Sequence, residues 1–213
     1  MFEEIKLKLH DLRLSVAAKA LEANGFKAYV VPDKEKAKEL ALNLIPSGSV
    51  VGVGGSVTIR ELGLIEELEK RGFKVIHHWL PLPPDELSEV RRKELTTDVF
   101  LSSSNAVTLD GKLVNIDGAG NRVAAMIFGP KRVIVVAGRN KIVRNVEEGI
   151  SRTKNIATIA NSIRLNRKPP CVTAGYCVDC RSPERACNIL VVLERKPSNA
   201  DYHVILVNED LGF

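Results

Sequence analysis

Acidic, amide and guanidinium side chains gather around two glycines just before a short predicted helix at 123–127. Asn115 and Asp117 precede the glycines, Gly118 is the first of them, and Asn121 and Arg122 follow. Glycine lets backbone N–H groups approach a ligand, and a helix start favours an anion. Asp117 would then act as a general base or nucleophile, while Arg122 would pair with a ligand carboxylate. The alternative is a plain turn in which Asp117 caps the helix.

A second candidate site follows the short apolar strand predicted at 50–53. Gly54, Gly55, Ser56 and Thr58 lead directly into a helical pattern at 59–71. Small hydroxyls and free N–H groups would converge there on a phosphate or carboxylate. The spacing is neither a dinucleotide-binding motif nor a P-loop, and the alternative is a glycine turn with Ser56 as the helix N-cap.

All the cysteines lie in one segment, at positions 171–187, as Cys171, Cys177, Cys180 and Cys187. Four clustered thiolates with a C-x-x-C at their centre can surround one metal centre. Disulfides suit exported proteins, and the charged N-terminal sequence does not resemble an export signal. An iron-sulfur cluster, a zinc ion and free redox-active thiols all remain open interpretations.

Two adjacent histidines, His77 and His78, follow a predicted strand at 73–76. Neighbouring residues of an extended segment point to opposite faces, so these side chains would not hold one metal together. Either could serve as a hydrogen-bond partner at the edge of a cleft.

The composition is that of an ordinary globular protein, with 45% hydrophobic and 27% charged residues in a chain of 213. We expect one α/β domain over 1–213, with a helix-strand-helix part at 1–45 and a cysteine-rich loop at 169–188. Without a long apolar run we expect a cytoplasmic protein with no membrane segment. The net charge is +5, but basic residues alternate with acidic ones and aromatics make up only 5%, so nucleic-acid binding is not expected.

Hydrophobic spacing predicts the elements that would position these groups. An amphipathic helix over 2–24 would pack through Ile5, Leu9, Leu12, Val16 and Leu21, and Asp33 would cap a helix reaching residue 44. Asp110-Gly111 predicts a hairpin turn within 107–116. The other expected helices cover 85–96 and 143–166, and the other expected strands cover 27–31, 99–102, 131–137, 188–194 and 202–208.

The run SSSNAVTLDGKLVNIDGAGNRVAAMIFGPKRVIVVAGRNKIV closely resembles the LUD-domain family, in particular the lactate-utilisation protein C or YkgG-like group. The resemblance extends from about residue 50 to the end of the sequence. It implies a mainly parallel α/β sheet flanked by helices, like that of glucosamine-6-phosphate deaminase, ribose-5-phosphate isomerase and the CoA transferases. It also implies a ligand cleft at the strand ends, with an anion held by the loop from Gly54 to Thr58. The cysteine segment resembles a variant found in one branch of the family.

Three functions follow as hypotheses. In the first, the chain binds a small anionic metabolite between the Gly54–Thr58 loop and a wall containing Asn105 and Arg122, as a subunit or accessory of a lactate-oxidising system. In the second, it is an independent isomerase-like or CoA-transferase-like enzyme using Asp117, although no glutamate clearly matches the CoA-transferase nucleophile. In the third, the cysteines make it an electron-transfer or redox-sensing module.

Overall fold

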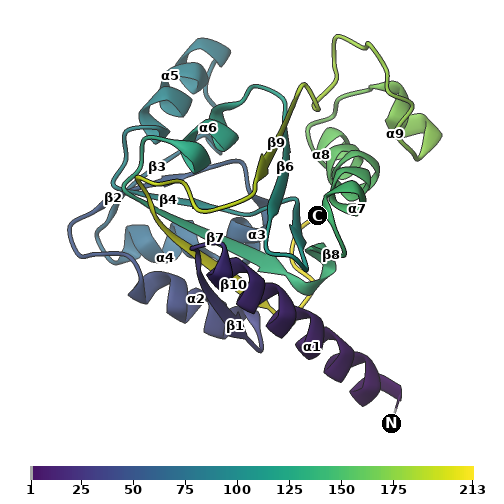
Figure 1. Cartoon of the computed structure of the whole chain (residues 1–213). Coiled ribbons are helices and arrows are strands. Elements are labelled where there is room, and N and C mark those ends of the chain that lie inside the picture. The colour runs from purple at the N-terminus through teal and green to yellow at the C-terminus, as the bar shows by residue number, and fades with distance from the viewer. Residues whose placement is uncertain (1) are drawn as a thin grey trace.

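The computed structural model describes residues 2–213 and has a fully parallel six-stranded sheet at its centre (Figure 1). Each neighbouring pair runs parallel, and helices lie on both faces. The predicted α/β fold class is therefore confirmed. In spatial order the strands are β1 (Lys27–Val31), β10 (Asp201–Val207), β7 (Arg132–Gly138), β4 (Val99–Ser102), β2 (Val50–Val53) and β3 (Lys74–His77).

A second, four-stranded sheet was not foreseen from the sequence. The predicted hairpin forms its centre, with the Asp110-Gly111 turn between two antiparallel strands. Pairing of the hairpin with a strand far along the chain completes the sheet, and local hydrophobic spacing carries no signal for such a pairing. The strands are, in order, β8 (Ile142–Val143), β5 (Ala106–Thr108), β6 (Leu113–Asp117) and β9 (Ile189–Leu193).

The two faces of the large sheet bury separate apolar cores. On β7, Val133 and Val135 face one core, whereas Ile134 and Val136 face the other, as strand alternation requires. The first core lies under α1 (Phe2–Ala23), α6 (Asn121–Ile127) and the second sheet. The second core lies under α2 (Lys34–Asn43), α3 (Val57–Glu61) and α4 (Leu64–Lys70). The remaining helices are α5 (Pro84–Glu94), α7 (Val146–Arg152), α8 (Thr158–Arg164) and α9 (Pro170–Ala174).

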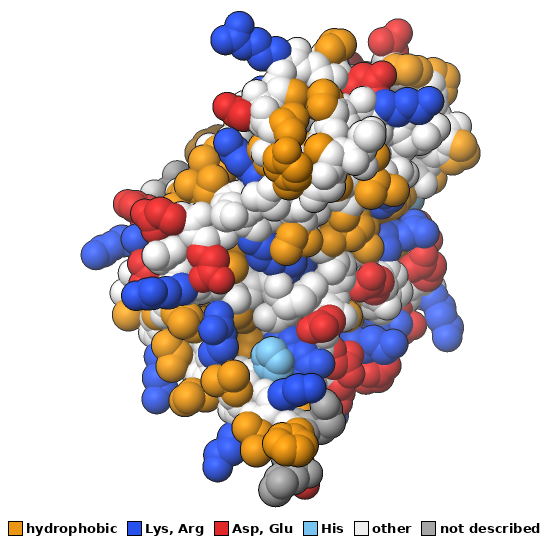
Figure 2. All heavy atoms as spheres, turned by 90° about the vertical axis from the view of Figure 1, so that its right-hand side faces the viewer, with side chains coloured by type: hydrophobic (Ala, Val, Ile, Leu, Met, Phe, Trp, Pro, Cys, Tyr) orange, Lys and Arg blue, Asp and Glu red, His pale blue; other side chains and the backbone are white. Residues whose placement is uncertain are grey.

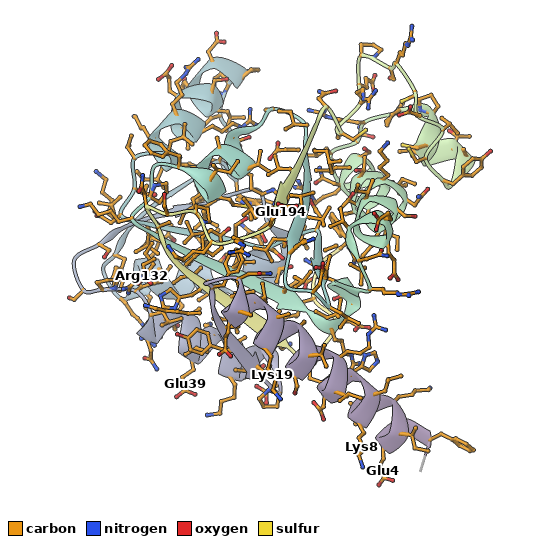
Figure 3. All side chains as sticks on the ribbon, in the orientation of Figure 1. Glu4, Lys8, Lys19, Glu39, Arg132 and Glu194 are labelled. Atoms are coloured by element: carbon orange, nitrogen blue, oxygen red, sulfur yellow. The ribbon has the colours of Figure 1, made fainter. Side chains whose placement is uncertain are left out.

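Of the residues predicted to pack helix α1 against the body, only Leu21 is buried, and Leu14, which was not among them, is buried as well. Leu14 and Leu21 are fully buried, whereas Ile5, Leu9 and Leu12 are 59%, 55% and 61% exposed. Only the C-terminal part of the helix lies over the sheet, and its other end projects from the body with Glu4 and Lys8 on it (Figures 1 and 3). The predicted apolar face is therefore longer than the part of the helix that contacts the body of the protein.

Two predicted helices are interrupted. The helix expected at 59–71 is divided into α3 and α4 at Gly63, which has a left-handed φ of 59°. The helix expected at 143–166 begins as α7, passes through a π-helical turn at Thr153–Ala157 and continues as α8. A π turn adds a residue and rotates the following face. Ile156, within the turn, and Ile163, in α8, are 51% and 60% exposed, whereas Ile159 is buried, so the isoleucines of this segment do not share one buried face.

Helix caps follow the sequence closely. Asp33 accepts a hydrogen bond from the Lys36 N–H, as predicted, and Ser56 accepts one from the Ile59 N–H, as the alternative interpretation of the glycine loop expected. Both side chains satisfy N–H groups that have no partner within their helices.

The surface charge is mixed. On the face seen in Figure 2, basic side chains lie among acidic and hydrophobic ones instead of forming one basic surface. Within residues 2–213, no helix has the length and apolarity needed to span a membrane.

Candidate functional site

A cavity of about 330 Å³ lies where the C-terminal ends of β7, β4, β2 and β3 meet. These four strands are neighbours and parallel, so the residues that follow them emerge at one edge of the sheet. Thr58 follows β2, His78 follows β3, Ser103 follows β4 and Lys141 follows β7, and all four line the cavity. Asp117, at the end of β6, contributes the opposite wall.

The glycine loop after β2 allows close packing as well as access to the cavity. A Cβ atom on Gly54 would lie 3.0 Å from the Phe100 ring and 3.2 Å from Arg122 Cγ. A Cβ atom on Gly55 would lie 3.1 Å from His78 Nε2. Gly55, Ser56 and Thr58 line the cavity, whereas Gly54 lies behind it.

Arg122 is held from several sides by the protein itself. Its Nη1 donates to Asn115 Oδ1 at 2.7 Å and to the Ser103 carbonyl at 3.0 Å. Its Nη2 donates to Asn105 Oδ1 at 2.9 Å and to the Ile116 carbonyl at 2.8 Å. The terminal N–H groups expected to bind a ligand carboxylate are therefore directed at protein oxygens. Arg122 joins the loop after β4 to strand β6.

Two of the predicted amide residues, Asn105 and Asn115, belong to the same network. Asn105 lines the cavity and also accepts from the Ile116 N–H, whereas Asn115 is buried and does not line the cavity. Asn121 lines the cavity from α6 and donates to Glu94 Oε2 at 3.5 Å.

Asp117, the last residue of β6, holds the turn that leads into α6, although the N-cap position itself is Gly120. Its Oδ1 accepts from the Gly120 N–H at 3.0 Å, its Oδ2 accepts from the Val123 N–H at 3.3 Å, and Arg122 Nε lies 3.7 Å from Oδ2. Both carboxylate oxygens thus have partners in the fold. Gly118 lines the cavity beside it.

Lys141 was not among the residues predicted for the site. It lies at the end of a short 3₁₀ turn (Arg139–Lys141) and is only 2% exposed. Its Nζ lies 2.8 Å from Thr58 Oγ1 and 2.9 Å from Ser103 Oγ. Burial, together with the nearby Arg152 and Arg122 guanidinium groups, lowers the pKa of Lys141 to about 7. Lys141 lies in the polar segment that follows an apolar strand, so its local sequence resembles that of a surface residue. Its burial results from the tertiary fold.

A histidine–carboxylate pair lies on the side of the cavity away from strand β7, which Lys141 follows. His78 Nδ1 lies 2.6 Å from Glu94 Oε1, and Glu94 is fully buried at the C-terminal end of α5. Since Nδ1 contacts the carboxylate, the other ring nitrogen, Nε2, faces the Gly55 loop. His77 points elsewhere, with its Nε2 3.7 Å from Glu69 Oε1, as the opposite-face argument predicted.

The charged side chains that line the cavity are predominantly basic. Within residues 2–213, Asp117 is the only acidic side chain in its lining. Arg164 lies over the Trp79 ring, with its Cζ 4.6 Å from the ring centroid. The basic side chains in the lining are Arg91, Arg122, Lys141, Arg164 and Arg167.

The cysteine segment adjoins this cavity. Ala186 lines it, and Asn188 donates from Nδ2 to the Gly118 carbonyl at 3.1 Å. Burial raises the pKa of the Cys171 thiol, and the three other thiols raise it further, so the four sulfurs lie within electrostatic range. In the described part of the chain, however, no three His, Cys, Asp or Glu side chains are arranged as a metal-ligand set.

Comparison with known proteins agrees with this architecture. A solved structure described as a DUF162 family protein from Deinococcus radiodurans is similar, with a TM-score of 0.54 and 18% sequence identity. The match covers 93% of this chain and 97% of that chain, and at this identity it shows the fold. No curated protein sequence matches the chain. Residues 14–207 match the LUD domain, and because this match spans most of the sequence and of both sheets, the chain belongs to the LUD domain family.

Proposed function

We propose that the cavity binds a small anionic metabolite and that the protein serves as a subunit or accessory of a lactate-utilisation system. The excess of basic side chains around the cavity carries this proposal. An anion entering the cavity would be attracted by several cationic groups and opposed by one carboxylate, whose oxygens already accept backbone hydrogen bonds. The volume of about 330 Å³ suits a small metabolite.

Arg91 provides specific support for an anionic ligand. It lines the cavity from α5, and its Nε is buried with no hydrogen-bond partner in the described structure. Its neighbour Arg92 instead points to the surface and pairs with Glu89. A partly buried guanidinium without a partner is costly unless a ligand satisfies it, because its hydration is reduced. A carboxylate or phosphate is the natural partner for its N–H groups.

Membership of the LUD domain family supports the lactate connection. Lactate and pyruvate each carry the carboxylate that the basic cavity favours, and both are small enough for it. We therefore place them first among candidate ligands, ahead of sugar phosphates and CoA.

Ligand-induced stabilisation tests this function. Thermal unfolding of the purified chain would be followed with lactate, pyruvate, sugar phosphates and CoA, each at constant ionic strength. A ligand that binds the folded state raises the Tm with its concentration. We expect at least one carboxylate or phosphate to do so, whereas a neutral analogue such as glycerol does not. A Tm unchanged by every anion would refute the proposed binding.

The four clustered thiols support a second proposal. In it, an iron-sulfur cluster or a zinc ion is held by Cys171, Cys177, Cys180 and Cys187. The mutual electrostatic effect of the thiols supports it, and Arg185 also donates to the carbonyls of Cys180 and Cys187, which draws those two residues together. A bound cluster would supply electron transfer beside the cavity. Anaerobic purification with absorbance and metal analysis tests this, and a colourless, metal-free protein would reject it.

We retain the enzyme hypothesis based on Asp117 only as a secondary alternative. The backbone hydrogen bonds to both of its oxygens favour a role in holding the turn before α6. Asp117→Asn should then preserve any activity that is found, and abolition of that activity without unfolding would restore Asp117 as a reacting group.

A further inference from the structure

Lys141 is the least expected group in the cavity. Its amine lies between the hydroxyls of Thr58 and Ser103, all three residues line the cavity, and each is at least nine-tenths buried. In the described structure no ion pair joins its Nζ to a carboxylate, and the charge of Glu61 raises the pKa of Lys141 by less than burial and the two guanidinium groups lower it. A buried lysine without a counter-ion is a poor structural element, because burying a charge is costly unless it is paired.

From this arrangement we infer that Lys141 is a reactive amine that forms an imine with an anionic carbonyl compound, such as a 2-oxo acid, bound in the cavity. This inference rests on the proposed anion binding and adds a covalent step to it. The amine supplies the selectivity for a carbonyl, and the surrounding basic side chains supply the selectivity for an anion.

The chemistry balances without a further reactant. The Nζ lone pair attacks the carbonyl carbon, the carbonyl oxygen takes up a proton, and the resulting carbinolamine loses water as the C=N bond forms. The Thr58 and Ser103 hydroxyls are placed to hand protons between Nζ and that oxygen. Each hydroxyl also contacts a backbone carbonyl, of Leu211 and Ser104 respectively, so both remain held when Nζ becomes covalently bound.

The electrostatics favour the nucleophilic form of the amine. Burial and the adjacent guanidinium groups lower the pKa of Lys141 to about 7, so the neutral amine is well populated at neutral pH. Arg122 and Arg152 act on the amine through their charge alone, because the terminal N–H groups of Arg122 donate to protein oxygens and Arg152 does not line the cavity. The carboxylate of a 2-oxo acid would be attracted by the other basic side chains of the lining, among them Arg91, whose Nε has no hydrogen-bond partner in the described structure.

Lys36 is the matched control. It is exposed, its Nζ pairs with Glu39 Oε2 at 2.8 Å, and this hydrogen bond raises the pKa of Lys36 above its usual value. At neutral pH its amine is almost entirely protonated. We expect reaction at Lys141 to be at least ~100-fold faster than at Lys36 at pH 7, since each pKa unit changes the neutral fraction tenfold.

Reductive trapping tests the inference on the whole chain. The protein would be incubated with pyruvate or glyoxylate, reduced with borohydride, and mapped by peptide mass spectrometry. We expect one reduced adduct on Lys141 that is absent from Lys141→Met and retained in Lys36→Met. Because the site is read from the wild-type protein, the result does not depend on the folding of Lys141→Met. Trapping should also rise with pH and level off above about pH 7.

Parallel thermal unfolding with pyruvate and its reduced analogue lactate separates the two proposals. If these anions stabilise the protein but adducts are absent, or are spread over exposed lysines, the covalent step is wrong and anion binding stands. If no anion stabilises the protein and no adduct forms on Lys141, both proposals are wrong.

Discussion

Glu94 Oε1 lies 2.6 Å from His78 Nδ1, and this pair joins helix α5 to the loop that follows β3. Glu94 is fully buried, and its other oxygen accepts from Asn121 on α6. One carboxylate therefore holds elements on two sides of the cavity. It also fixes the His78 ring so that Nε2 faces the glycine loop.

Replacing Glu94 should destabilise the fold. Glu94→Ala leaves the His78 ring and the Asn121 amide without their partner, and we expect the free energy of unfolding to fall by about 3 kcal/mol. Glu94→Gln keeps the size of the side chain and should cost less. Exposed Glu89, which pairs with Arg92 on the surface, is the control, and Glu89→Ala should change stability by less than ~0.5 kcal/mol. Equal effects of the two alanine variants in urea unfolding would contradict this prediction.

Arg91→Ala should weaken anion binding without loss of stability. Its guanidinium has no protein partner at Nε, so the folded state loses little, whereas a bound anion loses a charge-assisted hydrogen bond. We expect the Kd of a stabilising anion to rise about tenfold or more. Arg92→Ala, on the exposed side of the same helix, should leave the Kd unchanged. Isothermal titration of both variants provides the comparison, and an unaltered Kd in Arg91→Ala would exclude this residue from the site.

The lowered pKa of Lys141 predicts a specific dependence of stability on pH. Between about pH 7 and the usual lysine pKa, the unfolded chain carries a proton at this position and the folded chain does not. The unfolded state then binds more protons, so the free energy of unfolding rises with pH across this range. Below about pH 7 the buried Lys141 amine is protonated in the folded state as well, and the stability gained at higher pH is lost.

Lys141→Met should remove that pH dependence. The free energy of unfolding of wild type and of Lys141→Met would be measured from about pH 6.5 to about pH 9.5, a range we choose around the shifted pKa. The difference between the two proteins at each pH is the quantity to compare. Burial also raises the pKa of Tyr202, which makes stability fall above its usual pKa, so the measurement ends below that point. Parallel curves for the two proteins would show that Lys141 has an ordinary pKa.

The hairpin turn depends on glycine at position 111. Gly111 has a φ of 79°, and a Cβ atom there would overlap the Ala20 backbone and lie 2.6 Å from the Leu21 N atom. We expect Gly111→Ala to lower the free energy of unfolding by more than ~1 kcal/mol, because α1 must move as the turn becomes strained. Gly48→Ala is the control, since Gly48 has a similar φ of 78° but open space around it. If both variants lost the same free energy of unfolding in chemical denaturation, the effect of Gly111→Ala would come from backbone strain alone and not from the contact with α1.

Elements governed by local interactions were predictable from the residues alone. Asp110-Gly111 marked the hairpin, and Asp33 and Ser56 marked two helix starts, because turns and caps depend on residues only a few positions apart. The same holds for the parallel strands at 50–53 and 99–102, whose apolar runs identify them as buried.

The candidate site was predictable only in part. The Gly55–Thr58 loop and the wall containing Asn105 and Asp117 do line one cavity, as residues at the ends of parallel strands should. Asn115 and Gly54 do not line it: Asn115 accepts a hydrogen bond from Arg122, and a Cβ atom on Gly54 would lie 3.2 Å from Arg122 Cγ. Sequence pattern shows which polar residues are near a strand end, but not which oxygen each guanidinium will contact.

The chain's own residues thus determined its α/β class, its glycine loop and its hairpin, all of which follow from short-range propensity and spacing. Only the tertiary structure decided that Lys141 is buried between Thr58 and Ser103, and that Glu94 is enclosed beside His78. It also decided that β6 pairs with β9 in a second sheet. The physical reason is that burial and charge pairing are produced by segments far apart in the chain, so the environment of a side chain is absent from its local sequence.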